Sequence, residues 1–141
     1  MRTVEMAREY VRRAEATLEE ARRTFEKGDN PLTVRRSQEA VELSLKAALR
    51  FLGIEYPREH DVRDALLEAA ASRPMPEWFK AETEFMASVS SDLARKRGPA
   101  FYGDEQAILP PSSLFTEQDA RKALQDAERI YQNCERLISS A

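Results

Sequence analysis

Apolar residues recur at alternating steps of three and four along the first part of the chain, which places them on one stripe of a helix. They are Val4, Ala7, Val11, Ala14, Leu18, Ala21 and Phe25. Glu and Arg fill most of the other positions, so the remaining faces are expected to meet solvent. Residues 28–31 end this helix, because glycine interrupts it and Asp29 or Asn30 can cap a second helix with Pro31 in its first turn.

The second predicted helix, residues 32–52, is apolar on two sides and ends at Gly53. One stripe consists of Val34, Val41, Leu45, Ala48 and Leu52, and the other of Leu43, Ala47 and Phe51. Such a helix is expected at the centre of a bundle. Because one small bundle needs only one of these faces in its core, the pattern also favours a homodimer.

Two further helices are predicted at residues 62–71, capped by Asp61, and at residues 77–97, closed by Gly98 and Pro99. The second of these presents the residues Trp78, Phe85, Met86, Val89 and Leu93 inward. Residues 98–115 have no helical period but contain six large apolar or aromatic residues, so this connection is expected to be ordered and packed. Thr116 then caps a final helix, with Asp119 completing a capping box.

These elements predict an all-α fold, an antiparallel up-and-down bundle of four long helices plus one short helix. The 141 residues suit a single domain over residues 1–141. Composition agrees, since hydrophobic residues make up 42%, charged residues 33%, and glycines number only 4.

The charge balance and the single cysteine exclude several classes of function. A net charge of −3 leaves nucleic-acid binding to a local patch. Cys134 alone forms no internal disulfide or thiolate cluster, and His60 alone makes no zinc site, so neither a metal nor another cofactor is expected. Because no apolar run reaches the roughly 18–20 residues of a membrane span, the sequence predicts a cytoplasmic protein without a membrane partner.

Two polar features lie in or beside the second helix. Glu42 and Lys46 can pair at helical spacing, either as a structural pair or dimer contact, or as part of a polar pocket. His60 is a candidate for general acid–base chemistry, since its unperturbed pKa lies near 6.5. Its place directly before Asp61 at a helix start favours a capping or packing role instead.

A third feature is the cationic run Arg95, Lys96 and Arg97, followed by Tyr102. The cations can simply complement a helix dipole. Alternatively they form a phosphate-binding site in which the Arg97 guanidinium grips the phosphate and Tyr102 supplies a hydroxyl or a stacking face.

Residues 37–62, SQEAVELSLKAALRFLGIEYPREHDV, resemble the core pattern of the HEPN family, small helical bundles that work beside nucleotidyltransferases and in RNA-directed toxin systems. In that family a central helix carries a Glu and a Lys four residues apart, then a Leu-Gly turn, a proline and a His-Asp helix start. Here these are Glu42 and Lys46, residues 52–53, Pro57 and residues 60–61. The corner at residues 97–103 and the helix opening at residues 116–120 extend the resemblance over nearly the whole chain.

The resemblance implies a homodimeric nucleotide- or RNA-binding partner of a minimal nucleotidyltransferase, as in a toxin–antitoxin-like pair. Related HEPN toxins are silenced when that partner attaches nucleotides to a tyrosine near this corner, which makes Tyr102 a candidate acceptor. One alternative is a metal-independent ribonuclease with Arg97 and Tyr102 as catalytic residues at the dimer interface. Nuclease members carry a His shortly after the Arg, however, and this chain has none there.

The other alternative is a non-catalytic helical scaffold.

If Arg97 binds phosphate, Arg97→Ala is expected to weaken RNA or nucleotide binding by roughly 1–3 kcal/mol and to leave the fold intact.

Overall fold

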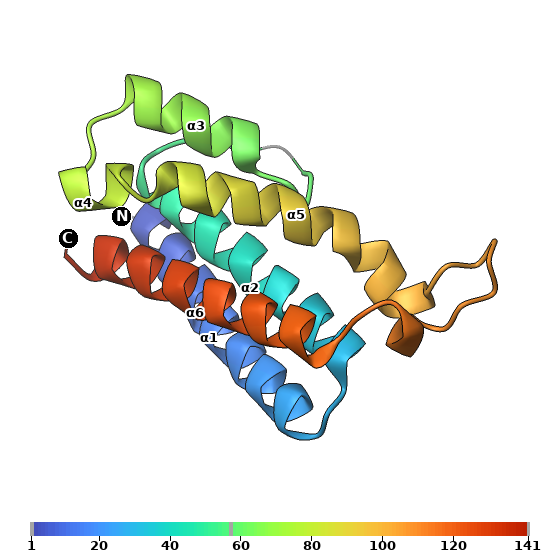
Figure 1. Cartoon of the computed structure of the whole chain (residues 1–141). Helices are drawn as coiled ribbons and strands as arrows, with labels where there is room; N and C mark the ends of the chain where they lie inside the picture. Colours follow the sequence, from blue (N-terminus) through green and yellow to red (C-terminus); the bar gives the residue numbers. More distant parts are fainter. Residues whose placement is uncertain (1, 57, 141) are drawn as a thin grey trace.

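Four long helices run alternately up and down: α1 (Arg2–Glu26), α2 (Asn30–Phe51), α5 (Thr83–Tyr102) and α6 (Glu117–Ser139) (Figure 1). The computed structural model describes residues 2–56 and 58–140, so Pro57 lies outside the described residues. The ten-residue helix α3 (Arg63–Ser72) packs on α5. The predicted all-α class is confirmed.

Helix α2 occupies the centre of the bundle and packs against α1, α5, α6 and α3. Its first apolar stripe is buried from Val34 to Ala48, and on the second stripe Ala47 is buried while Leu43 and Phe51 are half-buried. The predicted central position is therefore confirmed. Leu43 and Phe51 remain half-buried in the single chain, and the homodimer stays a prediction.

Local capping fixes the starts of two helices as predicted. The Asp29 carboxylate accepts the Leu32 N–H at 3.2 Å, with Pro31 in the first turn of α2. At the start of α6, the Thr116 hydroxyl accepts the Asp119 N–H at 3.1 Å and the Asp119 carboxylate accepts the Thr116 N–H at 2.8 Å. These contacts satisfy N–H groups that have no partner within the helix.

The predicted helix at residues 77–97 is wrong at both ends. The chain forms a single turn, α4 (Glu77–Lys80), and starts α5 only after a break at residues 81–82. The Thr83 hydroxyl donates to the Lys80 carbonyl at 2.7 Å and so satisfies an acceptor freed by the break. Phe79 and Met86, on either side of the break, are fully buried, and Trp78 is half-buried. The described residues therefore form two short α-helices, α3 and α4, where the sequence predicted one.

Helix α5 also continues through Gly98 and Pro99 instead of ending there. A proline inside a helix removes one backbone hydrogen bond, but its fixed φ is helical. The helix runs only one more turn, to Tyr102, and the Gly103 N–H donates to the Pro99 carbonyl at 2.9 Å. Gly103 ends the helix at a φ of 73°, where a side chain would be strained.

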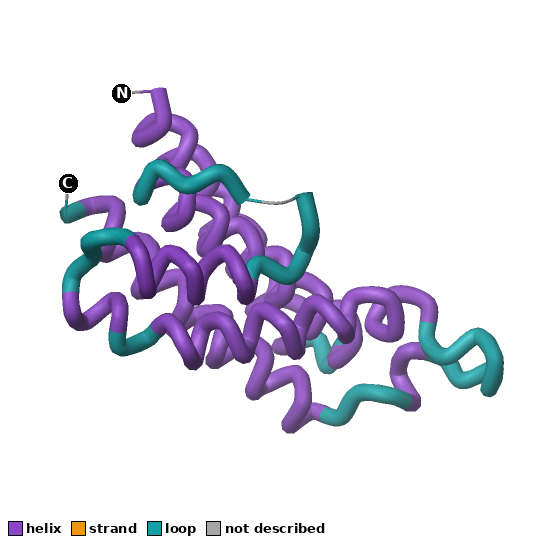
Figure 2. Tube along the Cα trace, turned by 90° about the horizontal axis from the view of Figure 1, so that it is seen from above, coloured by secondary structure: helices purple, strands orange, loops and turns teal. Residues whose placement is uncertain are grey.

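Residues 103–110, the tip loop, extend away from the bundle beyond the end of α5 (Figure 1 and Figure 2). The expectation that the whole connection is packed is wrong in part. Leu114 and Phe115 join the core, beyond the short helix η1 (Pro111–Ser113). Four large side chains stay exposed: Phe101, Tyr102, Ile108 and Leu109. Phe101 still contacts α2, because the Arg35 guanidinium lies 4.9 Å from the centroid of its ring.

The start of α3 is tied to α5, which fixes the segment that carries His60. The Asp61 carboxylate accepts the Arg63 N–H at 2.9 Å and receives a hydrogen bond from the Ser91 hydroxyl at 2.9 Å. The Val62 N–H donates to the Ser90 hydroxyl at 3.0 Å. The N-cap residue of α3 is Val62, so the predicted cap at Asp61 is wrong by one residue, and Asp61 instead stabilises the turn before the helix.

Candidate functional site

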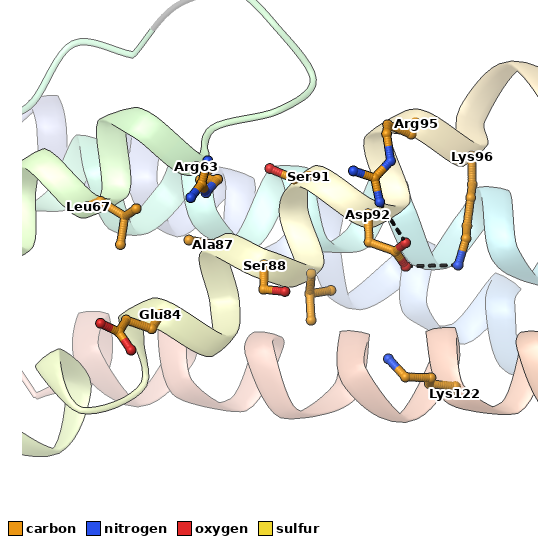
Figure 3. A pocket seen from close by; sticks show the side chains of 11 residues that line it. Arg63, Leu67, Glu84, Ala87, Ser88, Ser91, Asp92, Arg95, Lys96 and Lys122 are labelled. Carbon is orange, nitrogen blue, oxygen red and sulfur yellow. Dashed lines mark hydrogen bonds and ion pairs between the residues drawn. The ribbon is translucent and has the colours of Figure 1, made fainter.

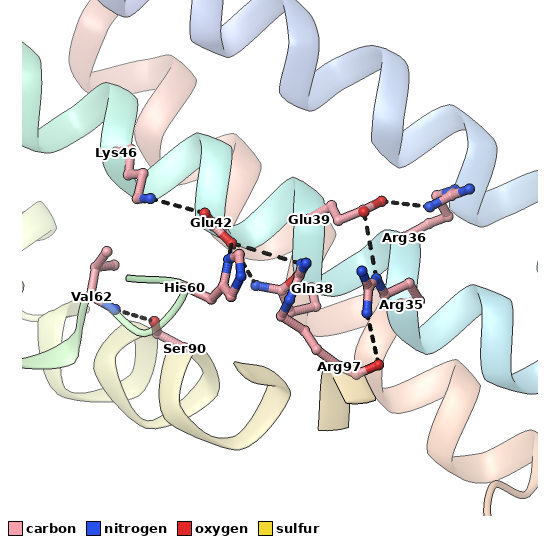
Figure 4. A network of polar contacts seen from close by, with 10 residues as sticks. All are labelled: Arg35, Arg36, Gln38, Glu39, Glu42, Lys46, His60, Val62, Ser90 and Arg97. Carbon is pink, nitrogen blue, oxygen red and sulfur yellow. Dashed lines mark hydrogen bonds and ion pairs between the residues drawn. The ribbon is translucent and has the colours of Figure 1, made fainter. Parts of the chain in front are cut away.

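A polar stripe runs along α2 between its two apolar stripes. It consists of Arg35, Gln38, Glu42, Lys46 and Arg50, which follow one another at steps of three or four. Side chains at these steps lie on one face of the helix. The stripe faces α5 and the segment before α3, so residues from three parts of the chain meet there (Figure 4).

Glu42 is the centre of this network. One of its carboxylate oxygens accepts from Gln38 Nε2 at 2.9 Å and lies 2.8 Å from His60 Nδ1, and the other accepts from Lys46 Nζ at 2.9 Å (Figure 4). The Arg97 guanidinium lies 4.0 Å from the first oxygen and donates to the Gln38 side-chain oxygen. The Glu42 side chain is 16% exposed, so it depends on these partners instead of water.

The balance of burial and hydrogen bonding keeps Glu42 ionised. Burial alone would raise the pKa of Glu42, but hydrogen bonds from Gln38, Lys46 and His60 outweigh it and hold that pKa below its ordinary value. An ionised carboxylate only accepts hydrogen bonds. His60 Nδ1 therefore carries the proton, and in the neutral ring the lone pair is on Nε2. The His60 side chain is 53% exposed, so this ring edge faces the surface.

Arg97 is held by α2 through both its side chain and its backbone. Its carbonyl accepts from the Arg35 guanidinium at 2.8 Å, and its own guanidinium is 18% exposed. Burial, followed by the nearby Arg35 charge, lowers the pKa of Arg97, while Glu42 and Glu39 oppose that shift. Arginine remains charged at any physiological pH. Arg97→Ala would therefore remove the donor to the Gln38 side-chain oxygen and one cation beside Glu42, so this variant is expected to lose stability as well.

The structure brings some of the predicted site residues together. Glu42 and Lys46 do pair, inside a larger network that also holds Arg97 and His60. His60 contacts the Glu42 carboxylate, and Val62 is the N-cap of α3, so of the two predicted roles of His60, capping and packing, the capping role is wrong.

Arg95 and Lys96 point to a different face of α5 from Arg97. They line a cleft of about 720 Å³ between α3, α5 and α6, where both pair with Asp92 at 3.2 and 2.8 Å (Figure 3). Arg63 and Lys122 border the same cleft. The three predicted phosphate-binding cations therefore do not form one cluster.

Tyr102 lies at the end of α5, away from the network. It is 64% exposed and packs edge-on against Phe101, with ring centroids 5.0 Å apart. Five residues along a helix correspond to roughly 140° around its axis, so Arg97 and Tyr102 point in different directions. Within residues 2–56 and 58–140 no hydrogen bond joins their side chains.

Three site residues were missed from the sequence: Gln38, Arg35 and Tyr56. Gln38 is 2% exposed, and its position four residues before Glu42 on a buried helix was the available signal. The Tyr56 ring lies under the Lys46 ammonium at 5.2 Å, and its hydroxyl donates to that of Tyr10 at 3.0 Å. No local pattern marks this tyrosine.

Two classes of function can be checked against the described residues. Groups of three or more His, Cys, Asp or Glu side chains with metal-site geometry are absent from residues 2–56 and 58–140. Over the same ranges, none of the helices combines the length and apolar character needed to cross a membrane.

These features define a helical bundle with a polar network built on its central helix. The family model described as "HEPN domain" matches residues 7–137, and the chain belongs to the HEPN family. A protein of Methanocaldococcus jannaschii named "Putative toxin MJ1304" is 28% identical over 131 residues, which is 90% of this chain and 84% of that protein.

Two crystal structures share the fold. TT1696 from Thermus thermophilus superimposes with a TM-score of 0.73 at 23% identity, covering 92% of this chain and 96% of that one. ST0689, described as an archaeal HEPN homologue, gives a TM-score of 0.68 at 26% identity, covering 94% of this chain and 97% of that one.

Proposed function

We propose that this HEPN protein is the RNA- or nucleotide-binding member of a toxin–antitoxin-like pair whose second member is a minimal nucleotidyltransferase. The similarity to a protein named as a toxin supports the first part. The proposal further assigns Tyr102 as the residue that the nucleotidyltransferase modifies. In that reaction the Tyr102 oxygen bonds to the α-phosphorus of ATP, pyrophosphate leaves, and the phenolic proton passes to solvent or a partner base.

The observation that carries this proposal is the exposure of the Tyr102 side chain to solvent. The chain has 4 tyrosines. The Tyr56 hydroxyl donates a hydrogen bond to the Tyr10 hydroxyl, and the Tyr131 hydroxyl donates one to the Glu15 carboxylate. Tyr102 has no such contact among the described residues and is 64% exposed. An enzyme can therefore reach its hydroxyl without unfolding the bundle.

The tip loop also holds Tyr102 in a defined place. Residues 104 and 109 exchange two backbone hydrogen bonds of 2.9 Å, and the Asp104 carboxylate accepts the Ala107 N–H at 3.0 Å. A Cβ at Gly103 would lie 2.1 Å from the Leu109 carbonyl oxygen, so only glycine fits this close turn. The loop is thus closed directly beside the tyrosine.

Incubation with a minimal nucleotidyltransferase and ATP should add nucleotide mass to the protein. Intact-mass spectrometry measures this, and Tyr102→Phe should abolish the addition. Tyr131→Phe is the matched control, since it removes a hydroxyl that already has a partner, and it should be modified like the parent protein. Equal modification of Tyr102→Phe, or none of the parent, would contradict the assignment.

We also propose that the protein is a homodimer, now through the exposed apolar side chains near the tip loop. Ile108 is 86% exposed and Phe101 52%, and apolar side chains of this size gain free energy when they leave water. Sedimentation velocity at micromolar concentration should give a dimer, and Ile108→Asp should shift it toward monomer. A monomeric parent protein would rule the dimer out.

A metal-independent ribonuclease is the second candidate function, favoured by the contact between His60 and Glu42. A histidine whose Nδ1 donates to a carboxylate presents a free Nε2 lone pair, the arrangement of a general base. Arg97 and Lys46 meet the same carboxylate and supply positive charge nearby. His60 replaces Tyr102 as the candidate base, because Tyr102 lies outside this network.

A further inference from the structure

The cleft between α3, α5 and α6 lies on the same face of α5 as Tyr102. Residues at steps of three and four share one face of a helix. Such steps connect the residues Ser88, Asp92, Arg95, Pro99 and Tyr102. From Arg95, which lines the cleft, to Tyr102 the helix makes two turns less roughly 20° and advances about 10 Å. The tyrosine that the proposed partner modifies is therefore in line with the cleft.

A second hollow, of about 390 Å³, lies beside Tyr102. It is lined by Gly98, Pro99, Tyr102, residues 103–106 and Leu114. Pro99 follows Arg95 by one turn on the same face of α5, so the hollow begins where the cleft ends. Gly98 and Pro99 are exposed and carry no long side chain that would separate the two. A partner seated in the cleft can thus extend to the Tyr102 hydroxyl.

Cations outnumber carboxylates around the cleft. The charged side chains that line it are Arg63, Arg95, Lys96, Lys122, Glu84 and Asp92. Asp126, beside the cleft, pairs with Lys122 at 3.0 Å, and the cations still exceed the carboxylates when it is included. Glu84 lies at the end of the cleft away from Arg95 and Lys96 (Figure 3). Positive charge therefore prevails at the end nearer to Tyr102.

A single carboxylate, Asp92, is shared by the cations at this end. Arg95 and Lys96 pair with it at 3.2 and 2.8 Å. Burial would raise the pKa of Asp92, but the hydrogen bond from Lys96 and the charges of Lys96, Arg95 and Lys122 hold that pKa below its ordinary value. The Arg95 side chain is nevertheless 74% exposed. Arg63 is also exposed and has no ion pair within residues 2–56 and 58–140, so both guanidinium groups can receive a carboxylate from outside.

The lining of the cleft suits a protein segment better than a nucleic acid. Among the described residues that line it there is no aromatic side chain on which an unpaired base could stack. Glu84 and Asp92 would repel phosphate groups. Ala87 and Ser88 are small and leave room for a polypeptide backbone, and Leu67 offers an apolar contact (Figure 3).

We infer that this cleft is the docking surface for the enzyme that modifies Tyr102, and that an acidic segment of that enzyme occupies it. Carboxylates of the segment pair with Arg63 and Arg95, while the catalytic site of the enzyme reaches Tyr102 beyond the end of the cleft. This inference rests on the proposed function and specifies the place and the charge of the contact. Charges at the rim of an interface mainly steer and orient association.

The kinetics of nucleotide addition by a minimal nucleotidyltransferase and ATP test this inference on the full chain. Arg63→Glu combined with Arg95→Glu reverses both available cations. The double variant should raise the KM for this protein by about 10-fold, because two exposed ion pairs become repulsive contacts. The kcat should not change, since the lost contacts are equal in the ground state and the transition state. Added salt should lower kcat/KM more for the parent than for the variant.

Arg8→Glu combined with Arg12→Glu is the matched control. Both arginines are exposed on α1, which packs on α2 and α6, and the net charge changes by the same amount. Arg12 pairs with Glu9 three residues away, as Arg95 does with Asp92. The control should keep the KM of the parent protein. Circular dichroism checks that both double variants are folded.

Two results would overturn the inference and leave the proposed function standing. In the first, Tyr102 of the cleft variant is modified with the KM of the parent. In the second, the control raises KM as much as the cleft variant, which would make the effect one of net charge. If the cleft variant loses affinity for a labelled RNA and keeps the parent KM, the cleft is a nucleic-acid surface instead. A parent protein that is never modified would remove the proposed function and this inference together.

Discussion

Glu42→Gln should lower the free energy of unfolding at pH 7 by about 2 kcal/mol. Removing one member of a buried ion pair typically costs roughly 3–5 kcal/mol, because the other charge stays buried without compensation. The smaller value expected here reflects the 16% exposure of the Glu42 side chain and the water that can reach Lys46 and Arg97. Urea unfolding measures the loss directly, and the melting temperature should fall by about 4–8 °C.

Glu19→Gln is the matched control for this measurement. Glu19 lies on α1, is exposed, and makes no ion pair among the described residues, so the same chemical change should alter stability by less than about 0.5 kcal/mol. A Glu42→Gln variant as stable as Glu19→Gln would show that solvent, and not Glu42, compensates the cations of the stripe.

The contribution of Glu42 to the free energy of unfolding should also depend on pH. Its pKa in the folded protein is below its ordinary value, which is near 4.3 in an unfolded chain. A depressed pKa contributes stability that is fully present above the unfolded pKa and is lost as the pH falls through the folded one. The stability difference between the parent and Glu42→Gln should thus shrink as the pH falls below about 4.

The parts of the fold that depend on local sequence could be predicted. The cap at Thr116 involves residues three apart, and the apolar stripe of α1 follows from helical spacing. Pro99 shows the limit of such reasoning, because proline usually ends a helix and here α5 continues for one more turn. The break at residues 81–82 likewise has no proline or glycine to mark it in the sequence.

The candidate site was predictable only as separate residues. The pair of Glu42 and Lys46 lies within one helix and follows from a spacing of four. Arg97 reaches Gln38 across 59 positions of sequence, and His60 reaches Glu42 across 18, so no local pattern could place them together. The position of His60 beside Asp61 favoured a capping role, and packing of the 60–62 segment on α5 decided otherwise.

Nearness in sequence was also misleading for Tyr102. Its closeness to Arg97 in sequence suggested one shared site, but their directions around α5 separate them. The structure therefore divides the predicted catalytic pair into a buried arginine that belongs to the polar network and an exposed tyrosine that belongs to the tip loop.

His60→Asn should reduce metal-free RNA cleavage by about 10²–10⁴-fold, if the second proposed function holds, because general acid–base groups contribute on that scale. In the expected reaction His60 Nε2 takes the proton of a ribose 2′-hydroxyl, the 2′-oxygen bonds to phosphorus, and the bond to the 5′-oxygen breaks. The 5′-oxygen then receives a proton from His60 or water. Asparagine can still donate to Glu42 from the position of Nδ1, so the network is kept while the base is lost.

The measurement uses labelled RNA with a chelator present, and an RNA with a 2′-deoxyribose at the cleavage position should resist the parent enzyme. Tyr102→Phe is the discriminating control. With His60 as the base, this variant should cleave at the parent rate, because Tyr102 lies outside the network that holds Arg97. Loss of cleavage in Tyr102→Phe with activity retained in His60→Asn would restore the tyrosine as the base. No cleavage by the parent protein would rule out the ribonuclease.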